Sequence, residues 1–431
     1  MKRIQIAWAP NIITRDIPRL LGLILSPWKW FGDRYVRKLE RALSSYLGIS
    51  VYSFDSGRSA LYALLKGFGI GNGDEVILQA FTCVALPNPI LWVGATPIYI
   101  DVDISNFNID IEDLRAKITS NTKAIIIQYT FGIAPDIEAI REICREYNIL
   151  LIEDCCHNLG QEFTIDGIHS KAGTLGDAAI FSFGMEKIVS GTRGGFACVA
   201  KQHSKVEEEV HQIATSLKAP RFREIVRGIT NPIVWKIKEH WGKLGDFIFS
   251  LFVRLRLLEL GLTKLELEGK QAPWLPYRMP NPNAYMGLIQ LEKIKKFNQH
   301  RVKIASEYYQ RFKTSTLLLI NEQNALNKKI GIVSEERAHQ FTEPVWLRFP
   351  ILVENAELIR QDLETKGIFL GNWYTEVIHC KDVDLDALKY IKGSCPNAEW
   401  LVERSLNLPT HYGMSSKDVK RITDELEKLV Y

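Results

Sequence analysis

The stretch FSFGMEK at residues 181–187 decides the fold of this 431-residue chain. It ends a strand-like run and leads into the glycine-rich stretch SGTRGG at residues 190–195. Upstream, the short apolar run ILLI at residues 149–152 closes on EDCCH at 153–157. Such a run predicts a buried parallel strand, and ligands of parallel sheets bind at the carboxyl ends of the strands. Asp154 and Ser182 both fall at such ends, so we expect a binding site there.

Lys187 and Asp154 are the two groups that an aldehyde cofactor such as pyridoxal phosphate needs. The lysine amine can form a Schiff base with the aldehyde, and the carboxylate can keep the cofactor's ring nitrogen protonated. Taken alone, a lysine after a strand is usually a solvated loop residue, and an acid at a strand end is usually a cap. The order of acid, histidine, serine and lysine favours the cofactor site, with Lys187 and Asp154 as its catalytic residues.

Composition excludes several other classes of protein. The chain is 46% hydrophobic and long enough for one large core and a smaller second one. A net charge of only +4 argues against nucleic acid as a partner. The nine histidines and seven cysteines show no metal-ligand spacing, so no metal is expected. Cysteines in apolar runs predict reduced thiols and a cytoplasmic location, and neither a signal peptide nor a membrane span is predicted.

The hydrophobic pattern predicts two α/β-type domains. Strand and helix signals alternate from about residue 50 to 200, which indicates a large α/β domain with a mostly parallel sheet. From residue 283 onward, helical and strand patterns indicate a smaller C-terminal α+β domain. The predicted strands are 75–78, 96–101, 124–127, 149–152 and 346–353, and the predicted helices begin after residue 57 and cover 136–147, 284–294, 299–313, 356–366 and 416–430.

Residues 215–272 interrupt this pattern. They are rich in Trp, Leu, Ile and Arg and show no strand alternation. The stretch from Lys218 to Lys264 contains ten Lys/Arg and four Asp/Glu. This local excess of six leaves −2 for the rest of the chain. We therefore predict three parts: an N-terminal arm and large cofactor-binding domain at 1–214, a basic, aromatic, helical insertion at 215–272, and a connecting helix with the small domain at 273–431.

Two interpretations of residues 215–272 remain open. Their mixture of Trp and Phe with Lys and Arg is typical of helices that lie in a membrane interface. The segment would then hold the enzyme at the inner face of the membrane as a peripheral contact. Alternatively, its apolar face covers the main domain or a partner subunit.

With these segments in place, the chain resembles the DegT/DnrJ/StrS family of pyridoxal-phosphate sugar aminotransferases, which have fold type I. The resemblance covers about 30–212 and 274–430. It implies that the chain moves an amino group from glutamate or glutamine to a nucleotide-linked keto-sugar, for surface glycan or related sugar biosynthesis, as a homodimer. The segments that carry it are SGRSAL (56–61), GATP (94–97), EDCCH (153–157), GDAAIFSF (176–183) and residues 187–195, with weaker support from YRM (277–279), QLEKI (290–294) and NLPTH (407–411).

The resemblance also implies a role for each residue around the cofactor ring. Lys187 would carry the cofactor covalently and then move the proton between substrate atoms. Asp154 would pair with the ring nitrogen. His157 corresponds to the Gln or His beside the ring's phenolic oxygen, although a core histidine with satisfied hydrogen bonds is the alternative.

The cofactor phosphate would lie at the start of the helix that follows Gly57. The resemblance places the Ser182 hydroxyl and the backbone amides of Arg58 and Ser59 around it, and a helix N-terminus favours an anion. Ser182 could instead bond only to neighbouring backbone.

Two positions depart from the family pattern. An aromatic ring usually stacks on the cofactor at the position of Cys83, so either Phe81, another ring or the thiol itself takes that place. An asparagine usually reaches the partner subunit's cofactor phosphate from the position of Pro276, which has no side-chain donor. Arg278 is a candidate replacement.

Other functions compete with sugar transamination. The cofactor could serve a cyclitol or a carrier-linked acceptor, or a carbon–sulfur lyase that uses Cys155 or Cys156. A regulatory protein that keeps only the cofactor pocket is a further alternative. Dehydratase relatives lack the Schiff-base lysine, so Lys187 favours the aminotransferase.

Overall fold

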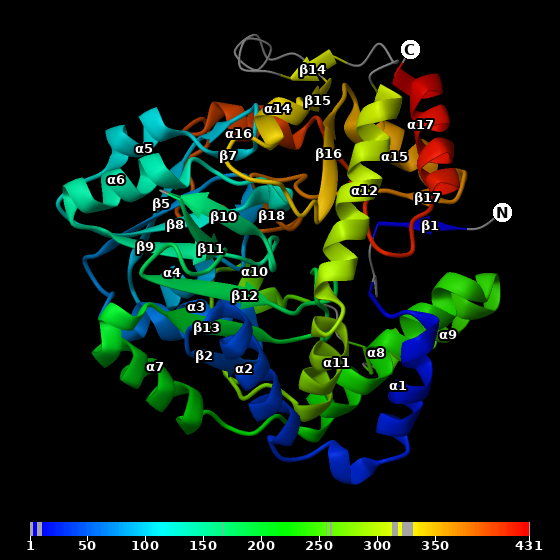
Figure 1. The fold of residues 1–431 in the computed structure, drawn as a ribbon, viewed down its shortest axis with the longest axis horizontal. Helices are drawn as coiled ribbons and strands as arrows, with labels where there is room; N and C mark the ends of the chain where they lie inside the picture. The colour runs from blue at the N-terminus through cyan, green and yellow to red at the C-terminus, as the bar shows by residue number, and fades with distance from the viewer. Residues whose placement is uncertain are drawn as a thin grey trace.

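The computed structural model describes residues 3–6, 11–165, 167–255, 257–258, 261–312, 318–320 and 331–430. Figure 1 shows a large sheet crossed by helices on one side of the molecule and a smaller sheet that packs against α12 and α17 on the other. Helices α1, α8 and α9 form a separate group below the small domain in this view. The predicted α/β fold with a mostly parallel large sheet is confirmed.

The large sheet has seven strands in the order β2-β13-β12-β9-β8-β3-β5. Strands from β12 to β5 run parallel, whereas β13 is antiparallel to both of its neighbours, β12 and β2. Parallel strands with both faces covered are apolar on both sides, which explains the continuous runs of Ile, Leu and Val in the sequence. The strands are β2 (Val51–Phe54), β3 (Glu75–Gln79), β5 (Thr96–Ile100), β8 (Thr122–Gln128), β9 (Leu150–Asp154), β12 (Ala178–Ser182) and β13 (Gly195–Val199).

The helices of the large domain carry capping residues that fix where they begin. α3 (Gly57–Gly67) starts at Ser56, whose side chain accepts the Ser59 amide, and α6 (Ile137–Tyr147) starts at Asp136, which accepts the Ala139 amide. The other helices of this part are α2 (Arg34–Leu47), α4 (Pro87–Trp92), α5 (Ile111–Lys117) and α7 (Ser204–Ser216).

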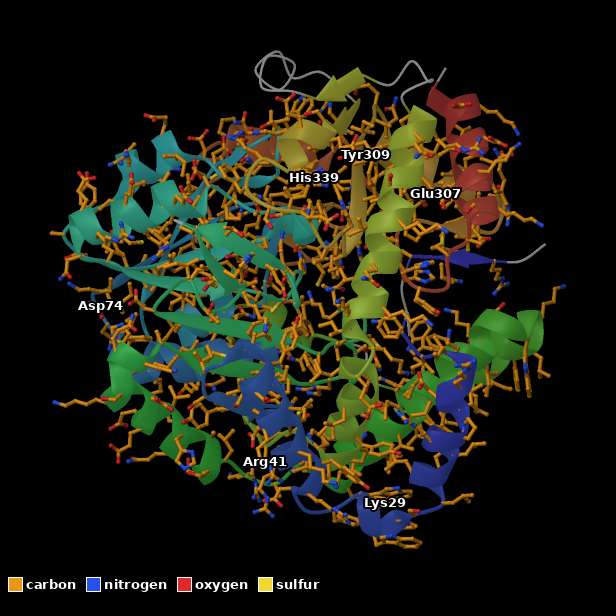
Figure 2. The ribbon with its side chains drawn as sticks, viewed as in Figure 1. Lys29, Arg41, Asp74, Glu307, Tyr309 and His339 are labelled. Atoms are coloured by element: carbon orange, nitrogen blue, oxygen red, sulfur yellow. The ribbon has the colours of Figure 1, made fainter. Side chains whose placement is uncertain are left out.

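The small domain has a four-stranded sheet in the order β14-β15-β16-β19. The long helix α12 (Ile294–Phe312) connects it to α11 (Asn281–Leu291) and packs against the last helix, α17 (Ser416–Val430). Tyr309 and Glu307 of α12 lie beside this domain in Figure 2. The elements are β14 (Leu318–Ile320), β15 (Gly331–Val333), α14 (Glu335–Ala338), β16 (Arg348–Leu352), α15 (Ala356–Thr365), α16 (Pro396–Val402) and β19 (Ser405–Pro409).

The described part of the segment 215–272 contains three helices after the end of α7. It contains α8 (Phe222–His240), α9 (Gly242–Arg254) and the short α10 (Lys264–Leu267). The Arg278 amide donates to the Lys218 carbonyl at 3.0 Å, so the chain enters and leaves this segment at one point. The segment is therefore an excursion from the large domain.

The structure of the N-terminal arm and a hairpin after β9 are among the features that were not predicted. The N-terminal arm forms a helix, α1 (Ile17–Ile24), and a short strand, β1 (Ile4–Gln5), which pairs with β17 (Ile368–Phe369) of the small domain. A hairpin of β10 (Glu162–Ile165) and β11 (Ile168–Lys171) follows β9. Both strand pairs are short, and a run of two to four residues gives too little alternation for a sequence pattern to register.

Candidate active site

The carboxyl ends of β9 and β12 and the start of α3 meet at one edge of the large sheet. Ile180 of β12 is the register partner of Asp154, and Ser182 lies two residues further along β12. Ser182 pairs in turn with Gly195 of β13, and Gly194 forms a bridge with Ser56, the cap of α3. The sheet register therefore brings together residues that lie up to 139 positions apart in sequence, as the sequence predicted for Asp154 and Ser182.

Asp154 is a buried carboxylate within electrostatic reach of Lys187. Its side chain is 6% exposed, and its Oδ1 accepts the Cys156 amide at 3.0 Å. Burial raises the pKa of the Asp154 carboxyl, while the hydrogen bond from Cys156 and the charge of Lys187 act in the opposite direction. A buried carboxylate favours a cationic partner, and a protonated ring nitrogen is a partner of that kind.

His157 is held as a neutral ring with a defined tautomer. Burial lowers its pKa well below the usual value, and the charges of Lys187 and Arg348 act in the same direction. Its Nδ1 lies 3.3 Å from the amide nitrogen of Phe131, which donates to it. Because Nδ1 accepts, the ring proton is on Nε2, and His157 can donate a hydrogen bond to an oxygen such as the phenolic oxygen of the cofactor.

The start of α3, where the cofactor phosphate is predicted to bind, is closely packed around Gly57. A Cβ on Gly57 would lie 3.4 Å from both the Cys156 Sγ and the Ser182 Cβ, so the helix start approaches the two strand ends directly. The Ser182 Oγ accepts the Gly184 amide at 3.3 Å. The Ser59 hydroxyl donates to Asp55 at 2.7 Å and its amide donates to the Ser56 Oγ at 3.4 Å, so both Ser59 groups already have partners within the protein.

Arg58 contributes a cation at the same helix start. Its Nε lies 2.7 Å from the Oε1 of Glu266, and the two side chains are 10% and 0% exposed. The other carboxylate oxygen of Glu266 accepts the Thr263 amide at 2.8 Å and closes the capping box of α10. Among the described residues, the two terminal nitrogens of Arg58 have no hydrogen-bond acceptor. Glu266 therefore fixes a guanidinium whose outer nitrogens remain available to a ligand.

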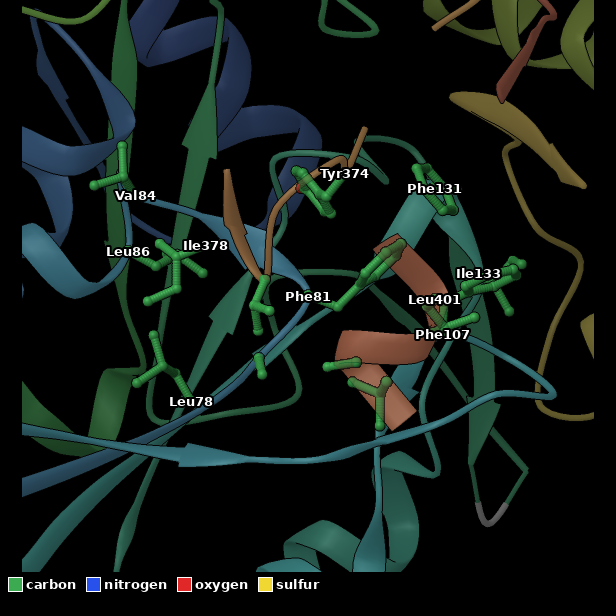
Figure 3. Packing of buried hydrophobic residues seen from close by; sticks show 14 of the residues in the cluster. Leu78, Phe81, Val84, Leu86, Phe107, Phe131, Ile133, Tyr374, Ile378 and Leu401 are labelled. Atoms are coloured by element: carbon green, nitrogen blue, oxygen red, sulfur yellow. The ribbon is translucent and has the colours of Figure 1, made fainter. Parts of the chain in front are cut away.

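Cys83 lies within the site, but Phe81 does not replace the missing aromatic ring. Cys83 ends β4 (Thr82–Cys83), and the charges of Lys187, Arg58 and Asp154 all reach its thiol, whose pKa is raised by burial. Phe81 is fully buried and packs against Phe107, Phe131 and Tyr374 in the core (Figure 3). The group that stacks on the cofactor is therefore either a different ring or the Cys83 thiol.

Trp373 is the ring that the sequence did not single out. Its ring is stacked on His157 with centroids 5.1 Å apart and planes at 10°, and the Lys187 Nζ lies 4.6 Å from its centroid. The Arg348 guanidinium lies 3.4 Å from the same centroid. Trp373 follows β17 in the small domain, so this domain supplies an aromatic wall to the lysine.

Arg348 connects the small domain to the lysine loop. It is 1% exposed, donates to Asn407 Oδ1 at 3.1 Å and forms an ion pair with Glu186, the neighbour of Lys187. The Trp373 amide donates to the same Asn407 oxygen at 2.9 Å. These contacts join residues from four separate segments. Glu186 and Asn407 lie in the stretches FSFGMEK and NLPTH, whereas Arg348 and Trp373 belong to no such motif.

The cysteines beside Asp154 are not reactive thiolates in this site. Burial raises the pKa of Cys155 and Cys156 well above the usual value, and nearby carboxylates act in the same direction. Within the described part of the chain, no group of three or more His, Cys, Asp or Glu side chains is arranged to hold a metal ion. In the same residues, no helix is long and apolar enough to cross a membrane.

The site fits pyridoxal phosphate on three observations. Among the described residues, Lys187 is the cation whose charge acts on the buried Asp154 carboxylate, the His157 Nε2 has no acceptor, and the outer nitrogens of Arg58 have no protein acceptor. These groups match a protonated ring nitrogen, a phenolic oxygen and a phosphate, respectively. Lys187, whose charge acts on both Asp154 and His157, supplies the amine.

Comparison with known proteins agrees with this geometry. The model of the DegT/DnrJ/EryC1/StrS aminotransferase family matches residues 12–225 and 267–427. GDP-perosamine synthase of Caulobacter vibrioides is 26% identical over 436 residues, covering 100% of this chain and 99% of that protein. GDP-perosamine synthase of Vibrio cholerae is 25% identical, with 96% of each chain covered.

Solved structures share the fold over their whole length. The putative sugar aminotransferase Spr1654 from Streptococcus pneumoniae, in its PMP form, superposes with a TM-score of 0.73 at 22% identity and covers 99% of both chains. Helicobacter pylori PseC, described as an aminotransferase in pseudoaminic acid biosynthesis, gives a TM-score of 0.71 at 21% identity and covers 100% of this chain and 99% of that one. Since the family model spans most of the chain, the protein belongs to the DegT/DnrJ/EryC1/StrS family and is a pyridoxal-phosphate-dependent aminotransferase.

Proposed function

We propose that this enzyme transfers an amino group from glutamate or glutamine to a nucleotide-linked keto-sugar, in the biosynthesis of a surface glycan or a related amino sugar. The observation that carries the proposal is the Lys187–Asp154 pair at the edge of the sheet, walled by His157 and Trp373. Full-length similarity to two GDP-perosamine synthases supports a nucleotide-linked sugar as the acceptor.

Each residue has a role that follows from its environment. Bound pyridoxal phosphate supplies an aldehyde for the amine and a ring that accepts electron pairs. Lys187 then binds the cofactor and moves the proton at the reacting carbon, since its amine lies within the walls of the site. Asp154 holds the proton of the ring nitrogen, and neutral His157 donates from Nε2 to the phenolic oxygen. Ring orientation is therefore set from both ends.

The phosphate ligands are proposed to come largely from one chain. Ser182 and the amides of Arg58 and Ser59 line the start of α3, and the Arg58 guanidinium adds a positive charge that Glu266 holds in place. This charge would compensate for Pro276, where the family often has an asparagine. Arg278 is exposed, so it is better placed to reach a partner subunit than this phosphate.

We also propose a homodimer, as the family resemblance implies. The competing lyase is disfavoured because the pKa of both candidate thiols, buried Cys155 and half-buried Cys156, is raised well above the usual value, mainly by desolvation. A purely regulatory role is disfavoured because such a protein needs neither a proton-moving lysine nor an acid for the ring nitrogen.

The deciding experiment is a panel assay. The purified protein is incubated with glutamate or glutamine and a set of nucleotide-linked keto-sugars, and the amino-sugar product and 2-oxo acid are measured together. Keto-cyclitols and keto-acids serve as non-sugar acceptors, and Lys187→Ala is the negative control. The proposal is supported if amino-sugar and the donor's 2-oxo acid (2-oxoglutarate from glutamate, 2-oxoglutaramate from glutamine) form with a keto-sugar and with no non-sugar acceptor. Turnover only with a non-sugar acceptor would show that the proposed keto-sugar acceptor is wrong, but it would leave the assignment of the cofactor site unchanged.

A further inference from the structure

Exposed apolar side chains are concentrated in two neighbouring segments, the N-terminal arm and the helices α8 and α9. Of the sixteen large hydrophobic side chains that are exposed in the described residues, eleven lie within 17–31 and 222–255. They come from the N-terminal arm and from α8 and α9, which are far apart in sequence and adjacent in Figure 1. Exposed Leu or Trp residues are unremarkable singly, but a contiguous group marks an interaction surface. The members are Ile17, Leu21, Leu25, Trp28, Phe31, Phe222, Trp241, Leu244, Phe247, Leu251 and Leu255, and we call this group the apolar face.

The apolar face is built from helices that each have two apolar sides. Ile17, Leu21 and Leu25 follow one another at four-residue spacing along α1, and Leu20 on another side of the helix is buried. Leu20 shares a small core with Trp235 of α8 and Met286 of α11, and Phe249 of α9 packs against that core. This core fixes α1 and α9 beside each other and leaves their outer sides without protein cover.

The outer side of α9 repeats the pattern. Leu244, Phe247, Leu251 and Leu255 recur at helical spacing and are 42–66% exposed. Trp241 at the start of α9 and Trp28 beyond the end of α1 are 56% and 74% exposed. Amphipathic rings at the ends of apolar stripes are typical of segments that lie at a membrane–water boundary.

The charge around the apolar face is strongly positive. Residues 15–31 and 221–255 contain ten Lys/Arg and four Asp/Glu, a surplus of six. Ion pairs join Asp16 to Lys293, Glu224 to Arg221 and Asp246 to Arg3, and among the basic residues Arg19 is paired with Glu292. Lys29, beside Trp28, lies at the outer end of the arm in Figure 2. Arg15, Lys243 and Arg254 are exposed and lie next to the apolar side chains in sequence, so the surface presents cations there.

We propose that α1 and α9 together dock this enzyme on the surface of an anionic lipid bilayer. Basic side chains complement anionic headgroups, and the two apolar stripes enter the boundary between headgroups and acyl chains. A second copy of the chain is a poor occupant, because a twofold contact would set this basic surface against itself. The docking holds whichever acceptor the enzyme uses.

Vesicle co-sedimentation of the full-length, cofactor-bound protein tests the proposal. We expect pelleting with vesicles that contain phosphatidylglycerol, little pelleting with phosphatidylcholine alone, and release as salt increases. Phe247→Asp combined with Leu251→Asp should lower the bound-to-free ratio by about tenfold or more, since two apolar side chains leave the boundary. Circular dichroism and cofactor absorbance should match those of the wild type.

The matched control carries the same chemistry on a different face. Leu358 and Ile391 are 64% and 74% exposed and lie in the small domain, so Leu358→Asp combined with Ile391→Asp should pellet like the wild type. An equal loss of vesicle binding in both double variants would overturn the proposal, because the added negative charge alone would then explain the loss. Wild-type protein that stays in the supernatant with anionic vesicles would overturn it in favour of a protein partner. Light scattering that shows a smaller assembly for the α9 variant would identify the face as a contact between copies.

Discussion

Arg58 and Glu266 allow fold stability and cofactor binding to be perturbed separately. Removing one partner of a buried ion pair costs about 3–5 kcal/mol, because the remaining charge stays buried without compensation. Arg58 keeps 10% side-chain exposure, so we expect the lower end, about 3 kcal/mol. Arg58→Met and Glu266→Gln should each lower the free energy of unfolding of the cofactor-free protein by that amount. The double variant should recover most of it, since a neutral pair carries no desolvation penalty.

Cofactor affinity should follow a different pattern across the same three variants. A hydrogen bond to a charged group contributes about 1.5–3 kcal/mol, so losing the guanidinium should weaken cofactor binding about 10- to 150-fold. Arg58→Met and the double variant should lose cofactor affinity equally. Glu266→Gln retains the guanidinium and should lose less cofactor affinity. Urea unfolding measures the first quantity, and titration of pyridoxal phosphate into the cofactor-free protein measures the second. A double variant that binds the cofactor like the wild type would refute the phosphate role of Arg58, and unchanged stability of both single variants would refute the ion pair.

Three more outcomes follow from the site and the family. Lys187→Ala should lose nearly all turnover. Borohydride reduction should leave a pyridoxyl group on the peptide that contains Lys187 in the wild type and should label no peptide in the variant. Turnover of the variant at a rate comparable to the wild type would disprove the assignment. Asp154→Asn should keep some cofactor but lose about 100-fold or more in kcat, because the ring nitrogen loses its acid; near-native rates would show that another acid serves the ring. Light scattering at micromolar concentration should give the mass of a homodimer, and an active monomer would contradict that expectation.

The catalytic edge was predictable from the sequence because its residues lie at the ends of strongly patterned strands. Asp154 and Ser182 follow apolar runs, and adjacent parallel strands must bring their carboxyl ends together. The helical character of 215–272 was predictable for a similar reason, since long amphipathic stretches give a strong periodic signal.

The remaining part of the site could not be read from local pattern. Glu266 meets Arg58 across 208 positions and lies just outside the residues matched by the family model, so neither spacing nor family resemblance indicates it. Trp373 belongs to an irregular loop between short strands, and its place against His157 depends on how the small domain packs on the large one. The apolar stripe of α1 was overlooked because eight helical residues give few turns over which to detect a period.

The hydrogen bond between the Arg278 amide and the Lys218 carbonyl brings the two ends of the helical excursion together, so evolution could insert or delete the excursion as one unit. Because its two ends meet, a chain of this family can gain or lose such a segment without any change in the path of the strands on either side. Two things would constrain that exchange here. A shortened chain would have to keep the turn that carries Glu266, and it would need polar replacements for Met286 and Ile289, which the loss of Trp235 would expose. Transplanted with the arm helix, the same module should confer its surface properties on a relative that lacks them.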